Sequence, residues 1–377
     1  VSLLYNAGDG TFADPVVLYA RNLVAEVAIA DINNDTDMDI IAANNSCDYF
    51  PTEGDSASSV SILENVGAEV FELTILDTYD TNYRYCNTYG YDPELGIICL
   101  VYAPSVVPDP REDPFGLDSI IVDTTVVNYR AHERATAMCV TDVNNDGYAD
   151  IAVTNRLTTS IAILVNNGDG TFPLDPDSLP CGKNDPNSIC TGDFNQDGWL
   201  DLANANGGND QVTVFLSNMD GTLGNPETSA PELVVDVGDL PTSICSGDVD
   251  GDGYLDLIVA NSLEANVSVL LWDPANNRFF AESVRPAGRG SRAVVTVDMC
   301  GDAALELVVA NNFDDNVSMM ISSDEFLFYS YNTVEFAAGN GPRDVACADF
   351  DGDGDNDIAV LNENDNTITI LFNQTIP

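Results

Sequence analysis

The sequence predicts an all-β protein, a β-propeller of seven four-stranded blades, and three observations carry this prediction. An acidic motif recurs at regular intervals, short apolar segments with strand-like alternation flank each copy, and no long segment has helical periodicity. Four antiparallel strands that recur about every 50 residues are typical of a propeller blade. An array of β-sandwich domains is disfavoured, because each sandwich needs about 100 residues.

The acidic motif sets the number of blades. It has the pattern D-x-[ND]-x-D-x-x-x-D, and its five well-preserved copies occupy residues 31–39, 142–150, 193–201, 248–256 and 349–357. A degraded sixth copy occupies residues 298–306. The first interval, 111 residues, is about twice the others, which predicts a seventh unit without an acidic loop within residues 72–130. The alternative is six blades, with residues 72–130 as an insertion.

Each repeat contains four strand segments in a fixed order. An alternating segment such as SICTGD precedes the acidic loop, which therefore lies between the first and second strands, and a segment such as DIAVTN follows it. A third segment such as IAILVN leads through the turn NNGDGTF to a fourth. Cys139, Cys190 and Cys245 share one register of successive first strands, which predicts small buried residues at this position.

The two ends of the chain are out of phase with a blade, within one propeller domain of residues 1–377. The chain begins and ends in a third strand. Residues 11–19 are therefore predicted to be the fourth strand of the last blade, which would close the ring. Residues 1–6 are then a surplus edge strand, which either pairs with another chain or belongs to an upstream domain.

The acidic loops are predicted calcium sites, about five in number. Calcium prefers six to eight oxygen ligands, and alternate acidic residues in a tight loop direct several carboxylates at one centre. Glycine at position six permits a left-handed turn, position seven offers its carbonyl oxygen, and position nine closes the loop. The predicted ligands are Asp31, Asn33, Asp35, Asp37, Asp39, Asp142, Asn144, Asp146, Tyr148, Asp150, Asp193, Asn195, Asp197, Trp199, Asp201, Asp248, Asp250, Asp252, Tyr254, Asp256, Asp349, Asp351, Asp353, Asp355 and Asp357.

The degraded loop is predicted to bind calcium weakly or not at all. It keeps Asp298, Asp302 and Glu306, but Cys300 replaces an oxygen ligand and Ala303 replaces the glycine. In the preserved loops, a bound ion would offset the repulsion between the carboxylates and tie two adjacent strands together. The calcium ions are therefore predicted to have a structural role.

The acidic loop, the apolar strand that ends in Asn and the N-x-G-D-G-T-F turn together resemble FG-GAP/VCBS repeats. Such repeats form the propeller heads of integrin alpha subunits and occur in many microbial surface proteins. The resemblance covers nearly the whole chain outside residues 72–130. It implies a calcium-binding propeller that is secreted or lies at the cell surface, and it does not specify the partner.

The amino-acid composition argues against several classes of partner and activity. The chain has 62 acidic against 12 basic residues, a net charge of −50, which disfavours nucleic acid and anionic membranes as partners. The chain contains no run of 18 apolar residues, so membrane insertion is not predicted. The single histidine, His132, and the lack of a G-x-S-x-G motif favour a protein that is not an enzyme.

These features favour a cell-surface adhesion or recognition module that binds a protein or glycan on a cell surface or matrix. One alternative is a structural subunit of an extracellular filament, in which copies of the chain join by strand exchange. The other is a calcium-dependent polysaccharide lyase or hydrolase.

Overall fold

A computed structural model defines the fold for most of the chain. Toward the N-terminus it describes residues 2–3, 16–17, 24–36, 38–44, 59–65, 71–76, 90–92 and 97–99. It then describes residues 135–374, apart from 174–175, 182–184, 225–230, 232 and 323–330. No helix in this part of the chain is long and apolar enough to cross a membrane.

The described strands assemble into six blades, each an antiparallel sheet in which consecutive strands are neighbours. Blade 1 contains β3 (Val24–Ala30), β4 (Asp39–Asn44), β5 (Ser59–Asn65) and β6 (Phe71–Leu76). Blade 2 contains β9 (Ala135–Thr141), β10 (Asp150–Asn155), β11 (Ser160–Leu164) and β12 (Asp177–Pro180). Blade 3 contains β13 (Pro186–Gly192), β14 (Asp201–Asn206), β15 (Gln211–Phe215) and β16 (Leu233–Asp236).

The remaining blades follow the same order. Blade 4 contains β17 (Pro241–Gly247), β18 (Asp256–Asn261), β19 (Asn266–Asp273) and β20 (Arg278–Pro286). Blade 5 contains β21 (Ser291–Val297), β22 (Glu306–Asn311), β23 (Asn316–Ser322) and β24 (Tyr331–Ala337). Blade 6 has three described strands, β25 (Pro342–Ala348), β26 (Asp357–Asn362) and β27 (Thr367–Leu371).

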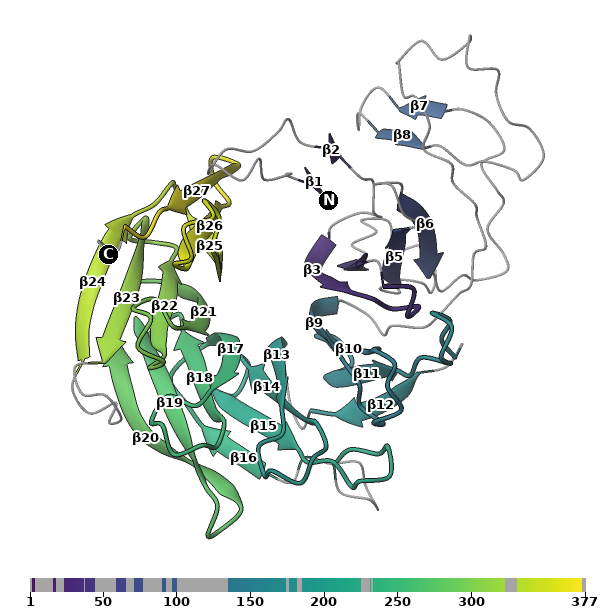
Figure 1. The fold of residues 1–377 in the computed structure, drawn as a ribbon, viewed down its shortest axis with the longest axis horizontal. Helices are drawn as coiled ribbons and strands as arrows, with labels where there is room; N and C mark the ends of the chain where they lie inside the picture. Colours follow the sequence, from purple (N-terminus) through teal and green to yellow (C-terminus); the bar gives the residue numbers. More distant parts are fainter. Residues whose placement is uncertain are drawn as a thin grey trace.

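The blades surround a common centre, with first strands innermost and fourth strands at the perimeter (Figure 1). The core lies between neighbouring blades, because each sheet covers the apolar face of the next. At the interface between blades 3 and 4, for example, Phe194 meets Phe279 edge to face at 5.3 Å, and Phe279 meets Trp272 at 4.8 Å. The predicted propeller fold is confirmed.

The structure corrects the predicted number of blades. Blades 1 and 2 are in direct contact through β3 and β9, and Ile41 and Ile62 share one core cluster with Met138 and Ile151. No blade therefore stands between them, and the six-bladed alternative with an insertion fits. Within the predicted insertion, β6 completes blade 1, and β7 (Gly90–Asp92) pairs only with β8 (Ile97–Cys99) in a separate sheet.

First strands of neighbouring blades are linked by side chains that accept backbone hydrogen bonds. Met138 N donates to Glu26 Oε2 at 2.7 Å, across the interface between blades 1 and 2. Ile244 N donates in the same way to the Ser188 hydroxyl at 3.2 Å, between blades 3 and 4. These residues hold equivalent registers, so the link is a repeated feature of the fold.

The first-strand cysteines are free thiols. Cys139, Cys190 and Cys245 are partly buried on β9, β13 and β17, close to the residues that link the blades. Burial raises the pKa of Cys245 to about 12, so its thiol stays protonated near neutral pH. A packing role agrees with the predicted small residues at this register.

The N-terminal residues form a short strand pair. β1 (Ser2–Leu3) pairs with β2 (Val16–Val17) in an antiparallel two-stranded sheet. Most of residues 11–19 lie outside the described residues, so their predicted role in closing the last blade stays a prediction, as does the surplus role of residues 1–6.

Candidate metal centres

Six acidic loops join the first strand of each blade to the second, so the antiparallel topology places all of them at the same end of the propeller. Position six has a positive φ in every loop. Glycine occupies it in four loops, with φ between 86° at Gly198 and 97° at Gly354. Thr36 and Ala303 adopt φ values of 79° and 68° at the same position. The predicted left-handed turn is therefore present even where glycine is absent.

The position-one aspartate organises each loop by accepting hydrogen bonds from its backbone. In the second loop, Asp142 Oδ1 accepts from Asp146 N at 3.0 Å, and Asp142 Oδ2 accepts from Gly147 N at 2.8 Å. Asp146 Oδ1 in turn accepts from Tyr148 N at 2.9 Å. The backbone of the loop thus folds around the carboxylates of Asp142 and Asp146.

The position-nine carboxylate is buried and bridges two backbone segments. Asp256 Oδ2 accepts from Val249 N at 3.1 Å, and its Oδ1 accepts from Trp272 N at 3.0 Å, at the end of the third strand. Asp150 and Asp201 make the equivalent pair of bonds. This bridge fastens the loop to its own sheet, a role that the motif alone did not reveal.

Burial makes these carboxylates hard to ionise in the absence of a cation. Desolvation raises the pKa of Asp256 and Asp201 to about 7 and that of Asp150 to about 6, against the lowering effect of their backbone hydrogen bonds. Neighbouring loop aspartates raise these pKa values further. A divalent cation would reverse this balance by compensating the negative charge.

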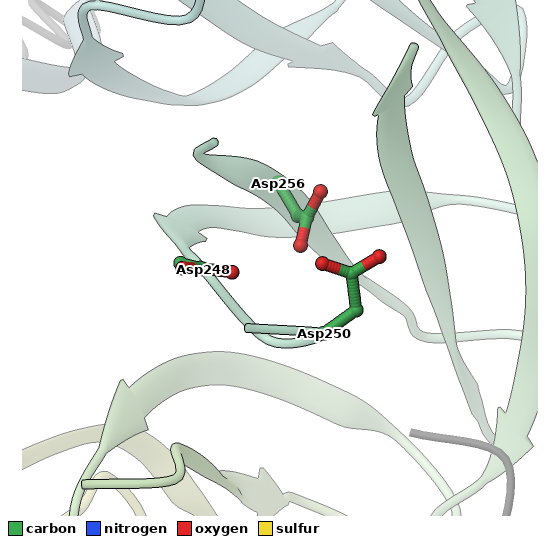
Figure 2. A group of neighbouring side chains, drawn as sticks. All are labelled: Asp248, Asp250 and Asp256. Carbon is green, nitrogen blue, oxygen red and sulfur yellow. The ribbon is translucent and has the colours of Figure 1, made fainter. Parts of the chain in front are cut away.

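Two loops bring three carboxylates together. In the fourth loop, oxygens of Asp248, Asp250 and Asp256 all lie within 4.8 Å of one another, and Figure 2 shows the three side chains around one small space. In the sixth loop the corresponding group is Asp349, Asp351 and Asp353. Hard oxygen donors at this separation suit calcium, which takes carboxylate and carbonyl ligands in flexible geometry.

The first three loops replace one of these carboxylates with an amide. Asn144 Nδ2 donates to Asp146 Oδ2 at 2.9 Å, and Asn144 Oδ1 accepts from Asp146 N at 3.0 Å. Asn33 and Asn195 make the same contacts in their loops. Asp37 lies outside the described residues, and the carbonyl ligands predicted at position seven of the other loops stay a prediction.

The degraded loop keeps the backbone arrangement but lacks an oxygen ligand. Asp298 accepts from Gly301 N and Ala303 N, and Glu306 accepts from Met299 N, as in the other loops. Cys300 is an exposed residue, but partial desolvation of its thiol, together with the neighbouring acids, raises its pKa to about 11. A protonated thiol is a poor ligand for a hard cation, which agrees with the predicted weak site.

The following blade supports the first acidic loop, which sequence reasoning also missed. Asn166, which starts the NNGDGTF turn of blade 2, donates to the carbonyl oxygen of Ile32 in the first loop at 2.7 Å. Gly170 of this turn lies so close to Asn33 that an added Cβ would be 3.2 Å from the Asn33 Cβ. The recurring Gly-Asp-Gly sequence of the turn could have indicated this contact, since a close approach of two backbones requires glycine.

Comparisons with known proteins place this geometry in a family. The model of the FG-GAP-like repeat matches residues 142–204, 193–259, 248–309 and 298–360, which together cover more than half of the chain. Integrin alpha-7 from Mus musculus is 29% identical over 140 residues, which is 33% of this chain and 12% of that protein. Integrin alpha-7 from Rattus norvegicus matches to the same extent. The chain thus spans a small part of these relatives.

Solved structures agree on the fold alone. A periplasmic gluconolactonase from Pseudomonas aeruginosa aligns with a TM-score of 0.59 at 13% identity, over 98% of this chain and 86% of its own. A protein from Lactobacillus plantarum aligns with a TM-score of 0.56 at 12% identity, over 97% and 89% of the two chains. With the matched repeats, the acidic loops and the propeller architecture together, this chain belongs to the FG-GAP-like repeat family.

Proposed function

We propose that this protein is a non-catalytic, calcium-stabilised recognition module that acts outside the cell and binds a protein or glycan. The group formed by Asp248, Asp250 and Asp256 is the observation that carries the calcium assignment, because three carboxylates are brought together with no arginine or lysine pairing to them in the described structure. Membership of the FG-GAP-like repeat family and the similarity to integrin alpha-7 support the extracellular setting.

The opposite end of the propeller is the proposed recognition face. It carries the turns between second and third strands, together with the connections from each fourth strand to the next first strand. Leu157, Leu263 and Phe313 lie exposed on three of these turns. Exposed apolar side chains on three turns at the same end of a highly acidic molecule would suit a partner that covers them.

Hydrogen bonds and an ion pair connect the turns and connections of the proposed recognition face. The first residue of the turn in blade 4, Ser262, donates its N–H to the carbonyl of Leu240 in the preceding connection at 3.0 Å, and Asn312 donates to Gly290 at 2.9 Å in blade 5. Arg289 pairs with Asp314 at 2.7 Å across the same two segments. A pre-organised surface loses little conformational entropy on binding, which favours affinity.

Calcium titration tests the metal half of the proposal. Calorimetry on the chelated protein is expected to give about five sites, and saturating calcium is expected to raise the melting temperature, because the ion binds the folded state. D248A should remove about one site, whereas D298A, in the degraded loop, is the matched control and should leave the number unchanged. A melting temperature that does not respond to chelation would contradict the assignment.

Binding assays test the recognition half. An array of matrix proteins and polysaccharides should yield a partner whose binding weakens in a variant with L263S and F313S, while D177N, an exposed change on β12, leaves it intact. Turnover of an acidic polysaccharide or a sugar lactone by the purified protein would instead favour an enzyme. A sugar lactone is included because the fold resembles that of a gluconolactonase.

A further inference from the structure

Each of the six described first strands has a β-bulge at its second residue, which is skipped in the pairing with the second strand of the blade. A bulge turns a side chain away from the regular alternation of its strand. The first strands begin at the end of the propeller that carries the proposed recognition face, so the bulges lie at this end. In blades 2 to 6 the bulge residues are Thr136, Asn187, Thr242, Arg292 and Arg343.

In blades 2, 3 and 4 the side chain of the bulge residue fastens the next blade. Asn187 Nδ2 donates to the carbonyl oxygen of Pro241, the first residue of the next first strand, at 2.8 Å. Thr242 Oγ1 donates to the carbonyl oxygen of Ser291 at 3.0 Å. Thr136 makes the equivalent bond from blade 2 to blade 3. The ordinary role of this position is therefore a structural link between neighbouring first strands.

Arg292 in blade 5 departs from this pattern. The acceptor that corresponds to its position, the carbonyl oxygen of Pro342, is bound by Asn312 Nδ2 at 3.1 Å. Among the described residues, none forms a hydrogen bond or an ion pair with the half-buried Arg292 guanidinium. The other arginines with described ion pairs each meet an acid of this chain, namely Arg156, Arg278, Arg289 and Arg343.

A second arginine, Arg343, holds the bulge position of the neighbouring blade. Arg343 Nη1 donates to Glu363 Oε1 at 2.7 Å, on the turn that follows β26. Burial lowers the pKa of Arg292, and the nearby charge of Arg343 lowers it further, against the opposing charge of Glu363. The carboxylate that favours the charged form of Arg292 is therefore already bound to another guanidinium group.

A half-buried arginine without a partner suits a carboxylate. The planar guanidinium group offers parallel N–H donors that match two carboxylate oxygens, and such a pair is strongest where water is partly excluded. The residues on either side of Arg292 are paired in the sheet, Ser291 with Asn311 and Ala293 with Ala310, so the backbone at this position is fixed. The net charge of −50 repels a densely charged polyanion, which favours a ligand whose carboxylates are isolated.

The surroundings of Arg292 favour a glycan over a protein as the source of this carboxylate. Phe313 is 65% exposed, and its N–H donates to the carbonyl oxygen of Arg289, in the segment that leads to Arg292, at 3.1 Å. An exposed ring beside exposed polar side chains, such as those of Asp315 and Asn364, fits a sugar ring and its hydroxyl groups. A protein attracted to this acidic molecule would itself be basic, and an unpaired arginine would repel it.

We propose that Arg292, with Arg343 beside it, binds the carboxylate of an acidic sugar in a glycan that carries such sugars singly. This assignment rests on the proposed recognition function, which it narrows from a protein or glycan to one class of glycan. The Arg292 guanidinium supplies the paired donors, and the charge of Arg343 adds to the attraction. The site lies at the opposite end of the propeller from the acidic loops, so it does not depend on calcium ligands.

Oligosaccharides that end in glucuronate, galacturonate or N-acetylneuraminate are the probes, each compared with a neutral counterpart by calorimetry on the full chain. At least one acidic probe should bind saturably and at least about tenfold more tightly than its counterpart, because a charge-assisted pair is made only with the acid. R292Q should abolish this preference. R156Q is the matched control, because Arg156 follows β10 at the same end of the propeller and its loss changes the charge equally.

Several results would overturn the proposal. Equal binding of acidic and neutral probes, no binding, or a preference that R292Q retains would each do so. A melting temperature that R292Q lowers far more than R156Q does would show that the guanidinium pairs within the chain. Tighter binding of a glutamate-terminated peptide at Arg292 would replace the glycan by a protein. A partner that needs Leu263 and Phe313 but not Arg292 would leave the proposed function intact and remove only this assignment, whereas the absence of any partner would count against both.

Discussion

Replacing Glu26 with glutamine should stabilise the protein at alkaline pH and leave its stability unchanged at acidic pH. Glu26 lies on β3, and its carboxylate accepts a hydrogen bond from Met138 N at 2.7 Å. Glutamine keeps an oxygen that can accept this bond and removes the charge. The comparison between the two side chains therefore isolates what the charge costs at the interface between blades 1 and 2.

The size of the effect follows from the pKa. Burial raises the pKa of Glu26 from 4.5 to about 7, the bond from Met138 lowers it in part, and the charge of Asp344 raises it further. The folded protein therefore holds a proton that the unfolded chain has lost between these values, and its stability falls as pH rises from about 4.5 to about 7. The difference corresponds to about 3 kcal/mol at 1.36 kcal/mol per pKa unit, or about 2 kcal/mol after allowance for partial exposure of the side chain.

Urea unfolding at pH 5 and pH 8, both with chelator, measures this difference. E26Q should exceed the parent protein by about 2 kcal/mol at pH 8 and by well under 1 kcal/mol at pH 5. E335Q, which removes a carboxylate from an exposed position on β24, is the control for the loss of one negative charge at the surface. A change in stability for E26Q that is equal at both pH values would refute the reasoning, because the charge would then carry no cost.

Two other substitutions test the loops and the turns. T36G should stabilise the chelated protein by about 1 kcal/mol in thermal unfolding, because Thr36 has a φ of 79° that glycine adopts without strain. G147A should destabilise the protein at the same loop position. Equal effects of the two substitutions would contradict this account. N311A should lower the free energy of unfolding by about 2–3 kcal/mol in chemical denaturation. Asn311 is fully buried, accepts a hydrogen bond from Gly288 N at 3.0 Å and donates one to Ser318 Oγ at 2.8 Å. A loss near zero would show that water replaces these bonds.

The strands and loops could be predicted from the sequence because their signals are local and repeated. The recurring Ser-Ile-Cys segment before the acidic motif marks β13 and β17, and glycine marks position six of four loops. Thr36 shows the limit of this reasoning, since the fold imposes a left-handed turn on a residue that disfavours it. In that loop the regular position of Asp31 and Asp39, rather than the glycine, identified the turn.

The number and closure of the blades could not be predicted, because they depend on contacts between distant residues. The long interval between Asp31 and Asp142 fits either an eroded blade or an insertion, and only the contact of β3 with β9 decides between them. The bridging role of Asp256 was hidden for the same reason. Its partner Trp272 lies in another strand, and nothing in the nine-residue motif points to it.

The position of the acidic loops explains why calcium would act on the whole propeller and not on single blades. Each loop is fastened to its own sheet by the position-nine carboxylate and, where blade 2 follows blade 1, held by Asn166 of the next blade. Asn373 makes the same bond from blade 6 to Met299 of blade 5 at 2.8 Å. Since the loops share one end of a molecule with a net charge of −50, their mutual repulsion acts across the blade interfaces. A cation in each loop would relieve repulsion where the blades meet, so its removal should loosen the interfaces before it unfolds any sheet.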